Sequence, residues 1–163
     1  MYDDLYNFIY RKEGINQEFD FDNFVKKLER LKLENNEFCY EVLIDSKTNE
    51  LKQAIWMFPE QKMNYCHFYD VVVFDNTYKT NRFGMPFGIF TGVNNYGQSI
   101  CFVKVIMSNE ISESFSWIFN NFLKMVNTLP KVFLTDEDQA IIKAVDLFLY
   151  RMEQSMLYVY GTF

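Results

Sequence analysis

The chain has 163 residues, 49% of them hydrophobic and 23% charged, so it is long enough for one domain with a substantial core. Its net charge of −6 argues against a module that binds nucleic acid by itself, because phosphate binding needs a basic surface. No apolar run is long enough to span a bilayer and the N-terminus lacks a signal-peptide pattern, so we expect a nuclear or cytoplasmic protein without a membrane partner.

The first part of the chain predicts a helix followed by a β-hairpin. Apolar residues recur at helical spacing over residues 21–31. Residues 38–45 then alternate between two faces as a half-buried strand does, and after a polar turn residues 51–58 form the return strand. Pro59 suits the first turn of a short helix. We assign residues 1–68 to this lead-in.

The second part, residues 69–163, predicts an α/β unit with the order strand, strand, strand, helix, strand, helix. The continuous apolar run at residues 71–74 is typical of a strand buried on both faces. Helices are indicated by apolar residues that repeat at helical spacing. We expect strands at residues 71–74, 87–93, 99–107 and 132–134, helices over residues 109–127 and around residues 141–148, and one more strand at residues 156–160.

Two aspartates follow strands of this unit directly. Asp75 comes after the apolar run 71–74, and Asp136 comes after the strand 132–134 and one threonine. A right-handed crossover through the intervening helix would make these two strands parallel neighbours, with both aspartates at the carboxyl edge of the sheet. Mg²⁺ prefers such oxygen ligands, and a pair of ions can activate an attacking hydroxyl and stabilise a leaving oxygen.

A purely structural explanation of the same residues stays open. Aspartates at strand ends often form turns or cap helices. Asp136 in particular could cap the helix that follows it, which contains Asp138. Cys66 and His67 are adjacent, whereas structural zinc sites use ligands spaced two to four residues apart, so no zinc site is recognised.

The sequence around these aspartates resembles the transposases of Mutator-like elements (MULE), and is most similar to the branch that includes the plant FAR-RED IMPAIRED RESPONSE-related transcription factors. The resemblance runs in the same order along the chain and covers roughly residues 20–148. It is carried by the segments Asp70–Pro86, Phe90–Ile100, Glu110–Leu123 and Leu134–Ala140, together with Trp56.

The resemblance implies a ribonuclease-H-like catalytic core that performs DNA transposition with an Asp-Asp-Glu site for Mg²⁺ or Mn²⁺. Asp75 matches the first catalytic aspartate and Asp136 the second, and Asp138 is an acidic neighbour. DNA is the partner implied. Lys79 and Arg82 either contact backbone phosphates or belong to a polar connection.

The chain departs from the family pattern after Phe148. The family continues with a Cys-x-x-His segment, an inserted helical region and the third acidic residue, but no Cys or His follows residue 101 here, and Glu153 matches nothing. We therefore expect a C-terminally truncated core that is inactive alone and prone to self-association through its exposed sheet edge. The alternative is a domesticated, non-catalytic descendant that acts in transcription or as an interaction module.

Overall fold

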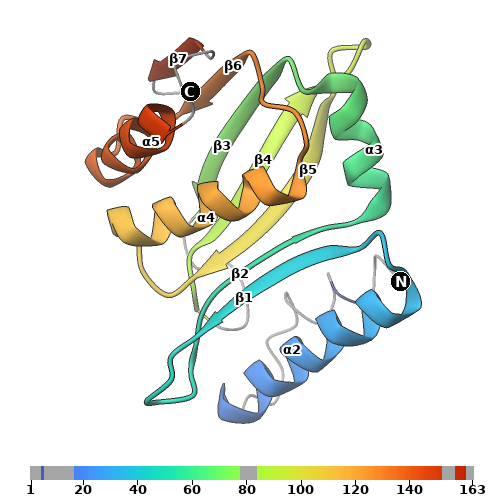
Figure 1. Ribbon diagram of the computed structural model, residues 1–163, viewed down its shortest axis with the longest axis vertical. Coiled ribbons are helices and arrows are strands. Elements are labelled where there is room, and N and C mark those ends of the chain that lie inside the picture. The colour runs from blue at the N-terminus through green and yellow to red at the C-terminus, as the bar shows by residue number, and fades with distance from the viewer. Residues whose placement is uncertain (1–4, 6–16, 78–83, 152–156, 161–163) are drawn as a thin grey trace.

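The computed structural model describes residue 5 and residues 17–77, 84–151 and 157–160. They form a mixed α/β fold around one seven-stranded sheet (Figure 1). The helices are α2 (Gln17–Glu34), α3 (Pro59–Phe68), α4 (Ser112–Met125) and α5 (Gln139–Arg151). The strands are β1 (Cys39–Ile44), β2 (Leu51–Met57), β3 (Val71–Thr77), β4 (Phe87–Val93), β5 (Ser99–Met107), β6 (Val132–Thr135) and β7 (Leu157–Tyr160).

The strand order across the sheet is β1-β2-β5-β4-β3-β6-β7. Neighbours are antiparallel from β1 to β3, whereas β3, β6 and β7 are parallel to one another. The predicted order of three strands, a helix, a strand and a helix is therefore confirmed. The predicted hairpin joins the same sheet through the pairing of β2 with β5. The final strand, expected at residues 156–160, pairs with β6.

The face of the sheet beneath α4 holds the larger part of the core, which is built from phenylalanine. Phe90 of β4 stacks on Phe122 of α4 with 4.2 Å between ring centroids, and Phe74 of β3 meets Phe119 edge-on at 5.3 Å. Phe133 of β6 contacts the same Phe119 at 5.6 Å. Because rings from β3, β4 and β6 all pack on α4, this helix fixes the three strands relative to one another.

The opposite face is covered by α2 where it meets the hairpin (Figure 1). Phe24, Leu28 and Leu31, all in the predicted apolar stripe, are fully or almost fully buried. Phe24 meets Trp56 of β2 edge-on at 5.6 Å, and Ile106 of β5 belongs to the same cluster. The hairpin and the central strands are thus joined by a shared core as well as by hydrogen bonds.

The structure corrects two expectations about β3. The run 71–74 is not buried on both faces: Val72 and Phe74 are buried, but Val71 is 38% exposed and Val73 is half-buried. The strand also continues past Asp75, because Asn76 and Thr77 pair with Gly88 and Phe87 of β4.

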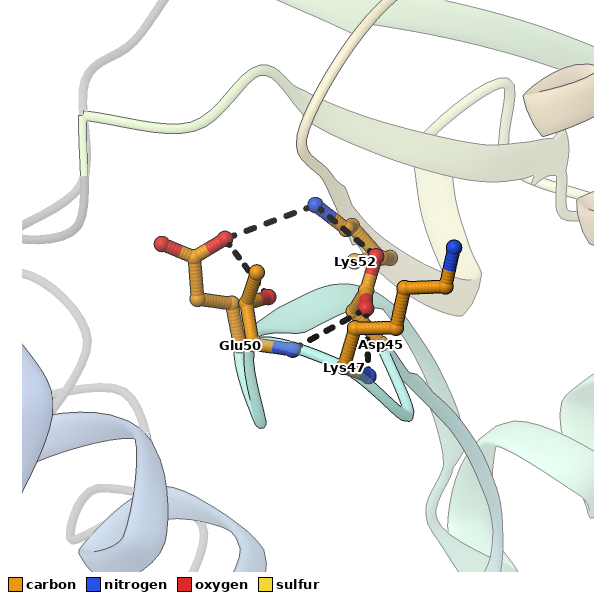
Figure 2. A network of polar contacts seen from close by, with 5 residues as sticks. Asp45, Lys47, Glu50 and Lys52 are labelled. Atoms are coloured by element: carbon orange, nitrogen blue, oxygen red, sulfur yellow. Dashed lines mark hydrogen bonds and ion pairs between the residues drawn. The ribbon is translucent and has the colours of Figure 1, made fainter.

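The turn between β1 and β2 is held by polar contacts around Asp45, at the same edge of the sheet as the carboxyl ends of β3 and β6. Its Oδ1 accepts hydrogen bonds from the amides of Lys47 (2.8 Å) and Thr48 (3.2 Å). Lys52 lies between the Asp45 and Glu50 carboxylates, 3.6 and 3.5 Å from their oxygens (Figure 2).

None of the helices in the described part of the chain is long and apolar enough to cross a membrane.

Replacing Gly92 with alanine should lower the free energy of unfolding by about 1–3 kcal/mol, because the new methyl group would overpack the core. A Cβ there would lie 2.4 Å from the Phe102 ring and 3.1 Å from the Val71 carbonyl oxygen. Gly88→Ala is the matched comparison, since its Cβ would stand 3.0 Å from the Phe74 ring and demands a smaller shift. Urea unfolding measures both changes, and a loss at Gly92 no greater than that at Gly88 would contradict this account.

Candidate active site

Asp75 is in β3, and Asp136 directly follows the last residue of β6, the neighbouring parallel strand. Val71 is opposite Val132 and Phe74 is opposite Thr135, so each residue from Val71 to Phe74 faces the residue 61 positions later in the chain. Asp75 and Asp136 each come directly after the last pair of this register. Adjacent strands are about 4.8 Å apart, and residues opposite each other share a face of the sheet. The expected parallel pairing of the two strands is therefore confirmed, and a metal site shared by the two carboxylates stays a prediction.

Asp75 lies on the face of the sheet away from α4, and Asp136 is near enough for its charge to act on Asp75. Side chains alternate along a strand, so Asp75 points away from the face into which Phe74 packs. On β6, the buried Thr135 likewise precedes Asp136, which is half-buried. Asp75 is exposed. Each carboxylate is thus carried by a strand whose preceding residue is fixed in the core, while the carboxylate itself is accessible.

The electrostatics of the pair are unfavourable in the absence of a cation. Partial desolvation raises the pKa of the Asp75 carboxyl above its ordinary value, and the negative charge of Asp136 raises this pKa further. Two ionised carboxylates held close together repel each other, and a divalent cation relieves that repulsion. The donor set is therefore chemically suited to a hard divalent cation such as Mg²⁺.

The aspartate that caps the following helix is Asp138, not Asp136. The Asp138 Oδ1 accepts hydrogen bonds from the amides of Ala140 (2.8 Å) and Ile141 (3.1 Å) at the start of α5. The capping role considered for Asp136 is therefore wrong, because Asp138 accepts the hydrogen bonds at the start of α5.

A hydrogen bond on the α4 side of the sheet, between Asn76 and Glu110, was not predicted from the sequence. Asn76 Nδ2 donates a hydrogen bond to Glu110 Oε1, in the connection between β5 and α4. Both residues are half-buried. The available signals were weak: a glutamate just before a helix is common, and 34 residues separate the two partners.

Lys104, which the sequence pattern did not indicate, lies in the same transverse row of the sheet as Asp75. Lys104 is opposite Ile89, and Ile89 is opposite Asp75, so this half-buried lysine shares the face of Asp75 two strands away. Burial lowers the pKa of the Lys104 ammonium, and the nearby Cys101 opposes that shift. The sequence alone does not predict which residues of β3, β4 and β5 lie opposite one another, so it could not place Lys104 in line with Asp75.

Other candidate ligands do not join the pair. Within the described ranges, no group of three or more His, Cys, Asp or Glu side chains is close enough together to hold a metal ion. Cys66 and His67 are both exposed. Lys79, Arg82 and Glu153 lie outside the described residues. A groove of about 470 Å³ between α4 and α5, lined by Ser116, Asn120 and Lys143 among others, lies on the opposite face from Asp75.

Comparison with known proteins bears on this site directly. A family model described as "MULE transposase domain" matches residues 71–156, more than half of the chain. The matched range begins with β3 and contains both aspartates, α4 and β6.

Several curated proteins of Arabidopsis thaliana are similar to the chain. Protein FAR1-RELATED SEQUENCE 5 is 36% identical over 123 residues, which is 76% of this chain but 16% of that protein. Protein FAR1-RELATED SEQUENCE 9 is 32% identical over 75% of the chain and 22% of its own length. Protein FAR-RED IMPAIRED RESPONSE 1 is 31% identical over 82% of the chain and 16% of its own length. The chain thus spans about a fifth or less of each of these relatives.

Asp75→Asn should stabilise the metal-free protein at neutral pH. Because the folded-state pKa of Asp75 is raised, ionisation of this carboxyl opposes folding, and the gain from the amide should vanish below the ordinary aspartate pKa of about 3.9. Thermal unfolding from pH 3 to pH 8 measures the effect. Asp45→Asn is the control of opposite sign, since backbone amides lower the pKa of Asp45. A neutral-pH loss of stability in Asp75→Asn would refute the electrostatic account.

Proposed function

Because the chain belongs to the family of MULE transposase domains, we propose that it is the ribonuclease-H-like core of a DNA strand-transfer enzyme. In this proposal Asp75 and Asp136 bind Mg²⁺ or Mn²⁺, DNA is the substrate, and this polypeptide by itself is inactive. The observation that supports the proposal is that β3 and β6 are parallel neighbours and that Asp75 and Asp136 each come directly after the last pair of their register.

The strand topology supports the ribonuclease-H-like assignment. β3, β4 and β5 form an antiparallel meander, and α4 then returns the chain so that β6 lies parallel to β3. This connection brings two carboxyl ends together at one edge, where open α/β sheets place their ligands. A metal ion bound there would activate an attacking hydroxyl and stabilise the leaving oxygen of a phosphodiester.

The residues of the chain supply positioning for this chemistry. Phe74, which is buried under α4, holds β3 in place, so the backbone position of the next residue, Asp75, is fixed. Asp136 follows Thr135, which is fully buried. Two carboxylates that each follow the last pair of neighbouring parallel strands could bind one cation with little movement of the strands, which would keep the geometry needed for in-line attack.

Inactivity of the isolated chain follows from charge and ligand number. The described residues bring no third carboxylate into a common metal site, so a bound cation would keep most of its water. The net charge of −6 also gives the chain little affinity for DNA at physiological salt.

A non-catalytic role in transcription or protein interaction is the second candidate. It is favoured by the similarity to the FAR-RED IMPAIRED RESPONSE group, to which several of the matched relatives belong by name. The two candidates differ in one respect that can be measured directly, namely whether Asp75 and Asp136 bind a divalent cation.

We expect Mn²⁺ to bind weakly to the full chain, at one site. Asp75→Asn and Asp136→Asn should each weaken binding about tenfold, the effect of losing one charged contact. Titration calorimetry measures the affinities. Asp138→Asn is the matched control, because this neighbouring carboxylate caps α5, and it should leave the affinity unchanged. Tight binding that survives both site substitutions would place the ligands elsewhere.

The isolated chain should neither nick nor join DNA. It should be incubated with Mn²⁺ and either supercoiled plasmid or oligonucleotides, beside the double variant Asp75→Ala/Asp136→Ala. We expect the two preparations to give equal backgrounds, because a loosely held cation does not fix the reacting groups. Nicking by the wild type that needs metal and is lost in the double variant would make this chain a minimal nuclease.

A further inference from the structure

The end of β3 is supported by hydrogen bonds from one neighbouring strand only. The pairing of β3 with β6 ends at Phe74 and Thr135. Beyond that point β3 continues through Asp75, Asn76 and Thr77, paired with β4 alone. The residue that carries the candidate carboxylate is therefore the first to lose its second strand partner, and a strand end held on one side frays more easily.

The hydrogen bond from Asn76 to Glu110 supplies a second support at this place. Asn76 and Phe74 lie two residues apart on the strand, so both point toward α4. The acceptor is a carboxylate, and hydrogen bonds with an ionised partner are about twice as strong as neutral ones. Both side chains are half-buried, which limits competition from water.

Glu110 is itself held by an ordered connection. Ser108 donates its amide hydrogen to the Lys52 carbonyl at 2.7 Å, which ties the end of β5 to β2. Ser114 Oγ contacts Asn109 Oδ1 at 2.6 Å, which joins the connection to the first turn of α4. Because the segment is pinned before and after Glu110, its carboxylate can act as a fixed acceptor.

β4 places no side chain of its own on the α4 face beside Asn76. The residue directly opposite Asn76 is Gly88, and Gly88 is also opposite Val105 of β5. A Cβ at this glycine would point to the α4 face, because it would meet the Phe74 ring at 3.0 Å. The intervening strand therefore places no side chain between β3 and the connection that carries Glu110.

We propose that Glu110 is a positioning residue that holds the end of β3, and with it Asp75, beside Asp136 through the hydrogen bond with Asn76. The use of Asp75 as a metal ligand rests on the proposed function, whereas the positioning itself concerns the metal-free fold. Glu110 acts through Asn76 and is not assigned as a ligand.

Amide hydrogen exchange by NMR on the metal-free full chain tests this. Glu110→Ala and Asn76→Ala should each speed exchange roughly tenfold at residues 75–77 and their β4 partners, the range expected for loss of a charge-assisted hydrogen bond. The double alanine variant should show no greater effect than either single change, because both remove the same bond. Glu110→Gln retains an acceptor oxygen without the charge, so its exchange rates should fall between those of the wild type and Glu110→Ala.

A reversed pair and a charge control separate positioning from general destabilisation. Asn76→Asp should disrupt the strand end because it opposes two carboxylates, and adding Glu110→Gln should rescue it by restoring a donor and an acceptor. Glu113→Ala removes an exposed charge from the first turn of α4 and should change nothing at β3. Additive single effects, failure of the rescue, or equal exchange changes throughout the sheet would overturn the proposal.

Mn²⁺ titration of the same variants distinguishes metal binding by Asp75 from the positioning of the β3 end by Glu110. If the strand end positions Asp75 for metal, both alanine variants should bind Mn²⁺ several-fold more weakly with little change in the thermal midpoint. If the wild type binds no Mn²⁺, the proposed function fails while the exchange data still decide the role of Glu110. Unchanged exchange at residues 75–77 in the alanine variants would reject that role even if Mn²⁺ binds.

Discussion

The parallel pairing of β3 with β6 is the interaction on which the rest of the site depends. It fixes which residues face each other as far as Phe74 and Thr135, the residues directly before Asp75 and Asp136. The pairing is in turn held from one side by α4, whose rings contact Phe74 and Phe133. An aromatic core on one face thus determines the position of Asp75 on the other.

The repulsion between the aspartates explains why this scaffold must be rigid. Like charges that were free to move would separate, and the pairing of β3 with β6 up to Phe74 and Thr135 limits that movement. Partial desolvation raises the pKa of the Asp75 carboxyl, and the negative charge of Asp136 raises it further. The same arrangement that disfavours the charged metal-free state favours a cation, so the local instability is consistent with a binding role.

The sequence predicted the elements of the fold and their order because apolar periodicity is local. It did not predict which faces stay open, because the run Val71-Val72-Val73-Phe74 reads the same whether one or both sides are covered. The two aspartates were found by their position after apolar strands and by the family resemblance. Glu110 was missed because its contact with Asn76 depends on the path of α4 and on an intervening glycine, neither of which leaves a pattern in the sequence. Asp138 was distinguishable from Asp136 as the cap only once the first residue of α5 was known.

The constant register between β3 and β6 also frees the chain between them from any fixed length. Turns such as Asn94–Gln98 can gain or lose residues, because strand pairing is determined within the strands and exposed connections tolerate insertion. Distant relatives could therefore keep both aspartates adjacent while the number of intervening residues drifts. A search pattern built on a fixed interval would miss such chains. A pattern of two short apolar strands, each followed within a residue by aspartate and separated by an aromatic-rich amphipathic helix, would find them.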